Sequence, residues 1–200
     1  MKHNLRAEAQ LFQQKFNQVI SDASGIDDHQ KYELLAEVIK FMKSAVNPFV
    51  ANNINYDNAV FLMGPTGSGK STLMNYLAGN DLYFRLFNDK PGIFPQIGKS
   101  IAFVGKGEGS TTLAPNIWVS NSDNFPNTTF IDCAGEFDSA GIIVDVINEK
   151  IKSIIAQNVD RAKIVIVTSQ NSIGPAGSYG ALFKQGLEKS AQFLNDISHF

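Results

Sequence analysis

Cysteine is almost absent from the chain, since Cys133 is the single one among 200 residues and cannot form an internal disulfide. Proteins of oxidising compartments rely on disulfides, so a lone thiol is typical of a reducing compartment. Long apolar runs are absent too. None approaches the roughly 18 residues of a membrane span, and the start MKHNLRAEAQ is too polar for a signal peptide. These absences predict a cytoplasmic protein with no membrane span.

A surplus of charge is also lacking, because the formal net charge is −2 and the isoelectric point lies near 5.9. Proteins that bind nucleic acids usually carry a basic surplus or a basic stripe, so no nucleic-acid partner is expected. The histidines are His3, His29 and His199, and this scatter does not fit the ligand spacing of a metal site. What is present in quantity is apolar material, 44% of the residues, which is enough for a packed core.

The first segment, residues 1–50, carries apolar side chains at helical spacing. A break at residues 21–25 divides it into two helices, and Asp27 or Asp28 is a candidate cap for the second. We expect this helical pair to pack on its own domain, with a surface for a second copy or a partner helix as the alternative. Asparagines and a proline in residues 47–55 predict a linker after it.

The second segment, residues 58–200, has a different texture, in which short apolar runs alternate with helical patterns. This alternation predicts an α/β fold of three layers, with helices around a largely parallel central sheet. We expect 163–168 to be its last strand, at an open edge of the sheet. Strands are expected at 59–63, 100–104, 116–120, 128–132 and 163–168, and helices at 70–79, 141–157 and 179–197.

The segment GPTGSGKS, residues 64–71, fits the P-loop pattern and stands between an expected strand and an expected helix, as that pattern requires. Its glycines let backbone N–H groups turn around phosphates, and the positive end of the helix adds attraction. Lys70 is expected to place a cation on the β- and γ-phosphates, and Ser71 to offer a hydroxyl to Mg²⁺. The expected nucleotide contacts in this segment are Gly64, Thr66, Gly67, Ser68, Gly69, Lys70, Ser71 and Thr72.

A second motif, DCAG, ends the strand expected at 128–132. In a P-loop protein the aspartate at such a strand end reaches Mg²⁺ through the water shell of the ion. Asp132 is therefore expected near the metal. The glycine of the motif can offer its backbone N–H to a γ-phosphate, so Gly135 is added to the expected nucleotide contacts.

A loop with two threonines, GEGSTTLAP at residues 107–115, lies between the two motifs. Nucleotide switches place a second Mg²⁺ hydroxyl in such a loop, just before an edge strand. Thr112 is the first candidate for this metal ligand and Thr111 the second. An ordinary loop rich in serine, threonine and glycine is the alternative.

Together, GPTGSGKST, STTLAP and DCAGEFD resemble the first three motifs of the P-loop GTPases. The likeness is nearest to the branch of septins, immunity-associated and immunity-related GTPases, and chloroplast-import GTPases, and it covers roughly residues 58–170. The resemblance implies a mixed sheet wrapped by helices, GTP with Mg²⁺ as the ligand, and pairing of copies through their nucleotide faces.

Two features depart from that family. Small members have a glutamine after the DxxG motif that orients the attacking water, and Glu136 stands there instead. Glu136 either accepts from that water or acts as a base, or it is a surface carboxylate. No N/T-K-x-D segment, which reads guanine, follows the strand expected at 163–168. Either the chain is the N-terminal part of a longer G domain or base recognition has diverged, and ATP stays open beside GTP.

Three functions follow from these motifs. The first is a GTPase-type switch or assembly module that binds GTP and Mg²⁺ and hydrolyses slowly, with Lys70, Thr112 and Glu136 as catalytic residues. The second is an ATPase or a kinase-like enzyme, and the third is a nucleotide-binding scaffold without hydrolysis. The DxxG motif with STT upstream favours the first. Beyond the nucleotide, a second copy or a protein partner is expected at the nucleotide face or at the N-terminal helices.

Overall fold

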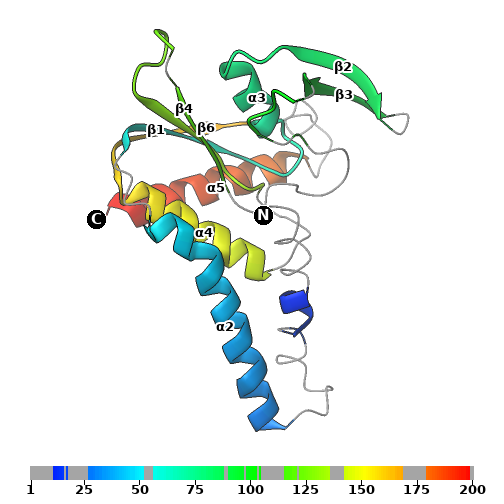
Figure 1. The fold of residues 1–200 in the computed structure, drawn as a ribbon, viewed down its shortest axis with the longest axis vertical. Coiled ribbons are helices and arrows are strands. Elements are labelled where there is room, and N and C mark those ends of the chain that lie inside the picture. The colour runs from blue at the N-terminus through cyan, green and yellow to red at the C-terminus, as the bar shows by residue number, and fades with distance from the viewer. Residues whose placement is uncertain are drawn as a thin grey trace.

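A computed structural model of the chain describes residues 11–15, 17, 27–51, 56–87, 90–96, 98–102, 104, 115–120, 122–135, 142–168 and 179–198. Residues 11–15 and 17 are helical. The further elements, labelled in Figure 1, are α2 (Asp28–Ala51), β1 (Tyr56–Met63), α3 (Lys70–Leu77), β2 (Leu82–Phe87), β3 (Lys90–Pro95), β4 (Asn116–Ser120), β5 (Thr128–Asp132), α4 (Ile142–Ala156), β6 (Val159–Ile166) and α5 (Tyr179–Ser198).

Four strands form one sheet in the order β4-β5-β1-β6. Strand β1 pairs in parallel with β5 and with β6, and β4 pairs antiparallel with β5. The sheet is therefore mixed and mostly parallel, which confirms the predicted α/β class. Strand β6 forms one edge of the described sheet, and it begins earlier than predicted because its register with β1 starts at the pair Tyr56 and Val159.

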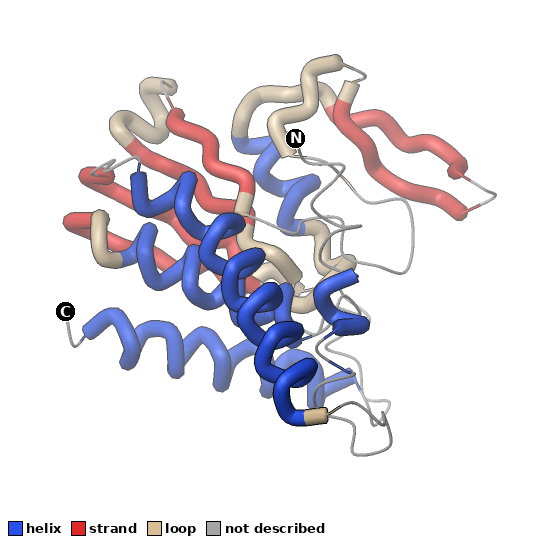
Figure 2. The backbone as a smooth tube through the Cα atoms, turned by 60° about the horizontal axis from the view of Figure 1, so that its bottom comes forward, coloured by secondary structure: helices blue, strands red, loops and turns tan. Residues whose placement is uncertain are grey.

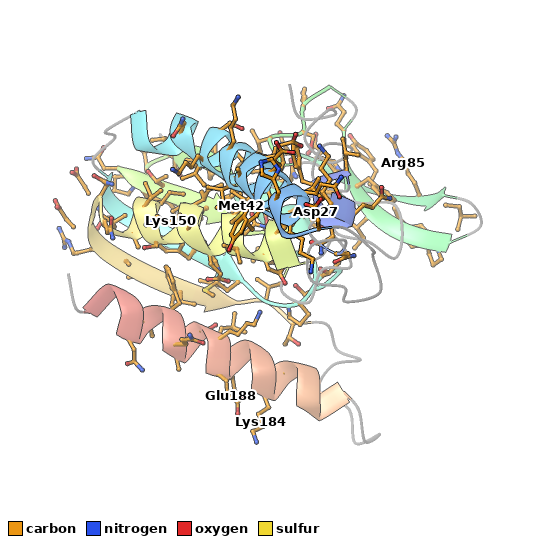
Figure 3. The ribbon with its side chains drawn as sticks, turned by 90° about the horizontal axis from the view of Figure 1, so that it is seen from below. Asp27, Met42, Arg85, Lys150, Lys184 and Glu188 are labelled. Carbon is orange, nitrogen blue, oxygen red and sulfur yellow. The ribbon has the colours of Figure 1, made fainter. Side chains whose placement is uncertain are left out.

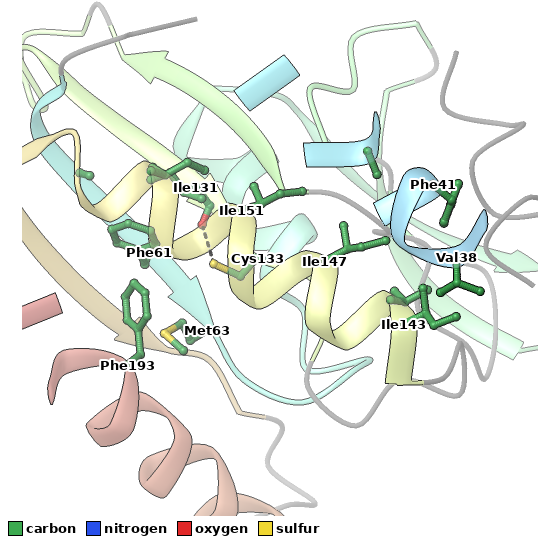
Figure 4. Close-up of a cluster of buried hydrophobic side chains, with 14 residues drawn as sticks. Val38, Phe41, Phe61, Met63, Ile131, Cys133, Ile143, Ile147, Ile151 and Phe193 are labelled. Atoms are coloured by element: carbon green, nitrogen blue, oxygen red, sulfur yellow. Dashed lines mark hydrogen bonds between the residues drawn. The ribbon is translucent and has the colours of Figure 1, made fainter. Parts of the chain in front are cut away.

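Alternate side chains of β1 face opposite sides of the sheet, as the two-residue period of a strand requires. Phe61 and Met63 belong to the larger core, where Phe61 meets Phe193 of α5 with ring centroids 5.1 Å apart (Figure 4). Leu62 points the other way and packs with Met74 of α3. Helices α2, α4 and α5 lie together on one side of the sheet (Figure 2) and α3 lies on the other.

Helix α2 packs on α4 rather than standing away from the domain. Its start is capped as predicted, because the side chain of Asp27 accepts a hydrogen bond from the Gln30 N–H at 2.9 Å. Val38 and Phe41 are buried, and Phe12 stacks on Phe41 at a centroid distance of 4.5 Å. The predicted amphipathic face is thus covered by the chain's own core. No helix within the described ranges has both the length and the apolar character needed to cross a bilayer.

The linker predicted to start at Asn47 is wrong at its beginning, since α2 continues through Pro48 to Ala51. A proline removes one backbone hydrogen bond from a helix. Here the missing bond is the one that residue 48 would donate to the carbonyl of Ser44, so a single bond is lost within the last two turns of α2. The burial of Phe41 and Ala45 against α4 holds the preceding turns.

The strand predicted at 100–104 is also wrong, because residues 100–102 and 104 are not extended ladder partners of any described strand. Their backbone groups are paired by a side chain instead. The Ile101 N–H donates to Asn75 Oδ1 at 3.0 Å, and the Ala102 carbonyl accepts from Asn75 Nδ2 at 2.7 Å. An apolar run whose backbone is satisfied in this way needs no neighbouring strand.

The hairpin of β2 and β3 was not predicted. Two prolines and a glycine in β3 argue against a strand, but in this two-stranded sheet β3 has one neighbour only, and edge strands tolerate proline. Arg85 lies on β2 with its guanidinium 5.7 Å from the ring centre of Tyr83 (Figure 3). Figure 1 shows the hairpin beside α3, on the far side from β1.

Candidate functional site

The loop between β1 and α3 closes around the amino group of Lys70. Lys70 Nζ donates to the carbonyl oxygens of Gly64 at 2.8 Å and Pro65 at 2.9 Å, and the residue is only 6% exposed. The Ser68 N–H donates to the Pro65 carbonyl at 3.2 Å and tightens the turn. A buried cation therefore sits within a curled backbone, directly before the first turn of a helix.

Glycine at position 64 is required by the fold. Gly64 has φ of 138°, in the region that side chains disfavour, and a Cβ there would lie 2.1 Å from the carbonyl oxygen of Val167. The loop is thus pressed against the end of β6. Gly67 and Gly69 also have positive φ values, 77° and 98°, but open space surrounds the position of their missing Cβ atoms.

The structure brings Ser71 and Asp132 together across 61 residues of sequence. Asp132 ends β5 opposite Leu62, because parallel strands bring their carboxyl ends to one edge of the sheet. Ser71 Oγ donates to Asp132 Oδ2 at 2.8 Å, and Asn116 Nδ2 donates to the same oxygen at 2.9 Å. The carboxylate is fully buried between the first turn of α3 and the start of β4.

The chain after β5 rests directly on the loop. A Cβ added to Gly135 would lie 2.3 Å from Thr66 Oγ1 and 2.9 Å from the Thr66 backbone nitrogen. No side chain fits in that space, so a glycine is needed where the DxxG motif has one. The two motifs that sequence analysis placed in one site are therefore in contact.

Three hydroxyl groups at this edge of the sheet have no hydrogen-bond partner among the described residues. They are the buried oxygens of Thr66, Ser68 and Thr168. Thr66 Oγ1 faces Gly135, and Ser68 Oγ would be 3.4 Å from a Cβ on Gly64. Buried hydroxyls are normally bonded, so an unpartnered group calls for an explanation. A polar ligand inside the loop would supply the missing partners.

Asn75 supports the site, and sequence analysis missed it. The residue is fully buried, and its Nδ2 donates to the Ser71 carbonyl at 2.7 Å as well as to Ala102. It thereby ties the first turn of α3 to residues 100–102. The available signal was its spacing, since Asn75 lies one helical turn after Ser71 and so on the same face of α3.

Asn116 was missed as well, although the two predicted strands held the clue. Segments 116–120 and 128–132 have equal lengths and a polar connection, which is the pattern of an antiparallel hairpin. That pairing sets Asn116 opposite Asp132, as the register of β4 and β5 has it. A donor for the buried carboxylate followed from this register.

Cys133 is a buried neutral thiol. Burial raises its pKa from 9.0 to about 12, against the opposing influence of the Lys152 charge. Its Sγ lies 3.8 Å from the carbonyl oxygen of Ile131 (Figure 4). A thiol that holds its proton so firmly is a poor nucleophile, so Cys133 fills space in the core.

The remaining predicted site residues are three that the structure does not describe and one, Thr72, that it does. Thr111, Thr112 and Glu136 lie outside the described residues. Thr72 is half-buried in the first turn of α3, next to Ser71. Within the described ranges, no three or more His, Cys, Asp or Glu residues gather in a way that could hold a metal ion by themselves.

Comparisons with family models, with curated proteins and with solved structures gave no match to this chain. The interpretation of the site therefore depends on its own geometry.

Proposed function

We propose that the loop of residues 64–71 is a P-loop that binds a nucleoside triphosphate with Mg²⁺, and that the chain is a GTPase-like switch or assembly module that hydrolyses slowly. The observation that carries this proposal is the 2.8 Å contact between Ser71 Oγ and Asp132 Oδ2. Two residues that the motifs assign to one ion meet at the mouth of a glycine-rich loop, although 61 positions separate them in the chain.

The phosphate chemistry follows from charge and backbone geometry. Lys70 brings a buried positive charge, and the loop and the first turn of α3 bring backbone N–H groups that lack helical partners. In the proposed complex the Lys70 ammonium exchanges the carbonyls of Gly64 and Pro65 for phosphate oxygens. The donor is charged in both states, so the exchange gains the attraction between a cation and an anionic acceptor in place of two neutral acceptors.

The oxygen donors at the site fit Mg²⁺. This ion prefers hard oxygen ligands and usually takes one or two protein groups while phosphates and waters fill the remaining positions. Ser71 and Asp132 meet that need without a larger cluster. Ser71 and Asp132 would hold the ion, and a bound Mg²⁺ would supply positive charge against the phosphates.

The switch part of the proposal concerns the segments that follow. Gly135 packs against Thr66, so the glycine of the DxxG motif lies beside the loop that is proposed to hold the phosphates. Thr112 as a second metal ligand and Glu136 beside the attacking water remain predictions from the sequence. Loops that order around a γ-phosphate are a common means of switching.

Titration with a fluorescent GTP analogue in Mg²⁺ tests the P-loop. Lys70→Ala should weaken binding at least roughly thirtyfold, which corresponds to about 2 kcal/mol for a lost charge-assisted contact. Lys150→Ala is the matched control, because Lys150 is an exposed lysine on α4 (Figure 3). Equal affinity in parent and Lys70→Ala, with unchanged far-UV circular dichroism, would refute the proposal.

A second titration tests the metal. Asp132→Asn preserves volume and removes the charge, so it should weaken binding much more in Mg²⁺ than in EDTA. Equal losses in both buffers would make Asp132 structural. Two further measurements separate the GTPase hypothesis from the ATP-binding one. They are the displacement of the analogue by GTP or ATP and the identity of the nucleotide that copurifies.

A further inference from the structure

A cavity of about 500 Å³, widely open to the surface, adjoins the proposed phosphate loop. It opens between α3 and the β2–β3 hairpin. Its volume lies within the range of about 300 to 1,000 Å³ that is usual for small-molecule sites. The lining residues are Gly69, Thr72, Leu73, Tyr76, Leu82 and Ile93.

Helical spacing builds one wall of the cavity. The α3 residues in it stand at i, i+3, i+4 and i+7, so they form one stripe that starts at the loop glycine Gly69 and ends at Tyr76. Seven residues of helix span about 10 Å. A molecule whose charged end lies in the loop can therefore extend along this stripe by the length of a sugar and a base.

The hairpin builds the facing wall. Ile93 pairs with Phe84 across the strands, and Leu82 lies two residues before Phe84, so the three side chains share one face of the hairpin. Tyr76 is 65% exposed and Ile93 is 52% exposed, although both are large and apolar. An aromatic ring and aliphatic side chains thus face each other across an open space next to an anion site.

We infer that this cavity holds the nucleoside of the bound nucleotide, with the base stacked between Tyr76 and Ile93 and the sugar beside Thr72. This inference rests on the proposed function. The occupant follows from continuity, because Gly69 of the proposed phosphate loop and Thr72, in the first turn of α3 directly after it, both line the cavity. The triphosphate matches the polar loop, and the flat face of the base matches the apolar side chains of the cavity that adjoins it.

The inference has a consequence for selectivity. Among the described residues that line the cavity, the side chains offer only the hydroxyls of Thr72 and Tyr76 as polar groups. Sites that form hydrogen bonds with the edge of a base reject an analogue that lacks the matching groups. Sites that bind a base through apolar contact discriminate weakly between different bases. The cavity therefore accepts purines as a class, and GTP and ATP should differ by less than about tenfold in affinity.

Calorimetric titration with GTP, ATP and inorganic tripolyphosphate, each with Mg²⁺, separates the cavity from the loop. Tyr76→Ala and Ile93→Ala should each weaken both nucleotides about tenfold, a typical loss for one stacking partner, and leave tripolyphosphate unchanged. Tyr76→Phe retains the ring and should weaken the nucleotides less than Tyr76→Ala. Val119→Ala, an exposed residue of β4 outside the cavity, is the control.

The outcomes distinguish the two proposals. Nucleotide affinities that fall in the cavity variants while tripolyphosphate binds as before support the inference. If tripolyphosphate binds but the variants leave GTP and ATP unchanged, or if all three ligands weaken equally, the inference is overturned and the P-loop proposal stands. If the parent chain binds none of the three ligands, the proposed function fails and the inference fails with it.

Discussion

The glycine-rich loop and the β2–β3 hairpin flank the same helix, α3. Charged side chains are usually exposed and apolar ones usually buried, and these two regions each show the reverse. The loop region buries charge, since Lys70 is 6% exposed and Asp132 is fully buried. The hairpin exposes apolar surface, since Phe84 and Leu86 are 72% and 67% exposed. Buried polar groups and exposed large apolar groups are the informative exceptions in a protein. Both exceptions border one helix, and they are the observations on which the proposed nucleotide site rests.

The largest effect should come from closing the space at the loop. Gly64→Ala introduces a Cβ that would lie 2.1 Å from the Val167 carbonyl, at a φ of 138°. Backbone strain and overpacking together should cost about 2 to 5 kcal/mol of unfolding free energy, measured by urea denaturation. Gly67→Ala has positive φ and open space, so it should cost about 1 kcal/mol. Equal losses would mean that the loop is not pressed against β6.

The next effect concerns the buried polar groups around the loop. Asn75→Ala leaves the Ile101 N–H without its side-chain partner, whereas the Ala102 carbonyl still accepts a hydrogen bond from Ser100 Oγ. An unpaired buried group costs about 1 to 3 kcal/mol, so we expect a loss of about 1 to 3 kcal/mol in the same denaturation experiment. Asn80→Ala removes a single bond, from Asn80 Nδ2 to Asn75 Oδ1, and should cost about 1 kcal/mol. A tolerated Asn75→Ala would show that water replaces this network.

The buried thiol beside the loop predicts a pH dependence. Its pKa is raised from 9.0 to about 12 by burial, so the folded chain holds the proton more firmly than the unfolded chain. The stability due to Cys133 is complete below pH 9 and is lost as pH rises towards 12, by about 1 kcal/mol per pH unit. Urea denaturation between pH 9 and 10.5 measures this slope. Cys133→Ala should flatten it, and an unchanged slope would place the titrating group elsewhere.

The smallest effect is expected on the hairpin, where it bears most directly on the comparison. Leu86→Ala should change the unfolding free energy by less than about 0.5 kcal/mol, because the side chain is mostly exposed. Leu62→Ala, at a fully buried leucine of β1, should cost about 2 to 5 kcal/mol. A loss above about 1 kcal/mol for Leu86→Ala would mean that another surface covers the hairpin in solution.

Much of the fold followed from the sequence, because its elements have strong periods and clear ends. Strands β4 and β5 occupy the predicted residues 116–120 and 128–132, and α4 and α5 end within one residue of their predicted bounds. The hairpin was missed because its stability comes from cross-strand pairing and from contact with α3. Neither is visible in a local pattern that contains two prolines and a glycine.

Part of the candidate site could be predicted from the sequence and part could not. The proximity of Ser71 and Asp132 follows from the rule that parallel strands end at one edge of a sheet. The roles of Asn75 and Asn116 depend on which backbone and carboxylate groups surround them after folding, so residue type alone gave no sign of them. The cavity between α3 and the hairpin could not be predicted either, because one of its two walls is the β2–β3 hairpin, which was not expected to form strands.

The position of the Lys70 ammonium has a consequence for the energetics of recognition. Two carbonyl oxygens, from Gly64 and Pro65, hold the cation at 2.8 and 2.9 Å, so the chain itself fixes the curvature of the loop. The conformational entropy of that curvature is lost on folding, before any anion arrives. In the proposed complex, an entering anion would meet a loop that is already curved and would replace two neutral acceptors, which keeps the cost of association low.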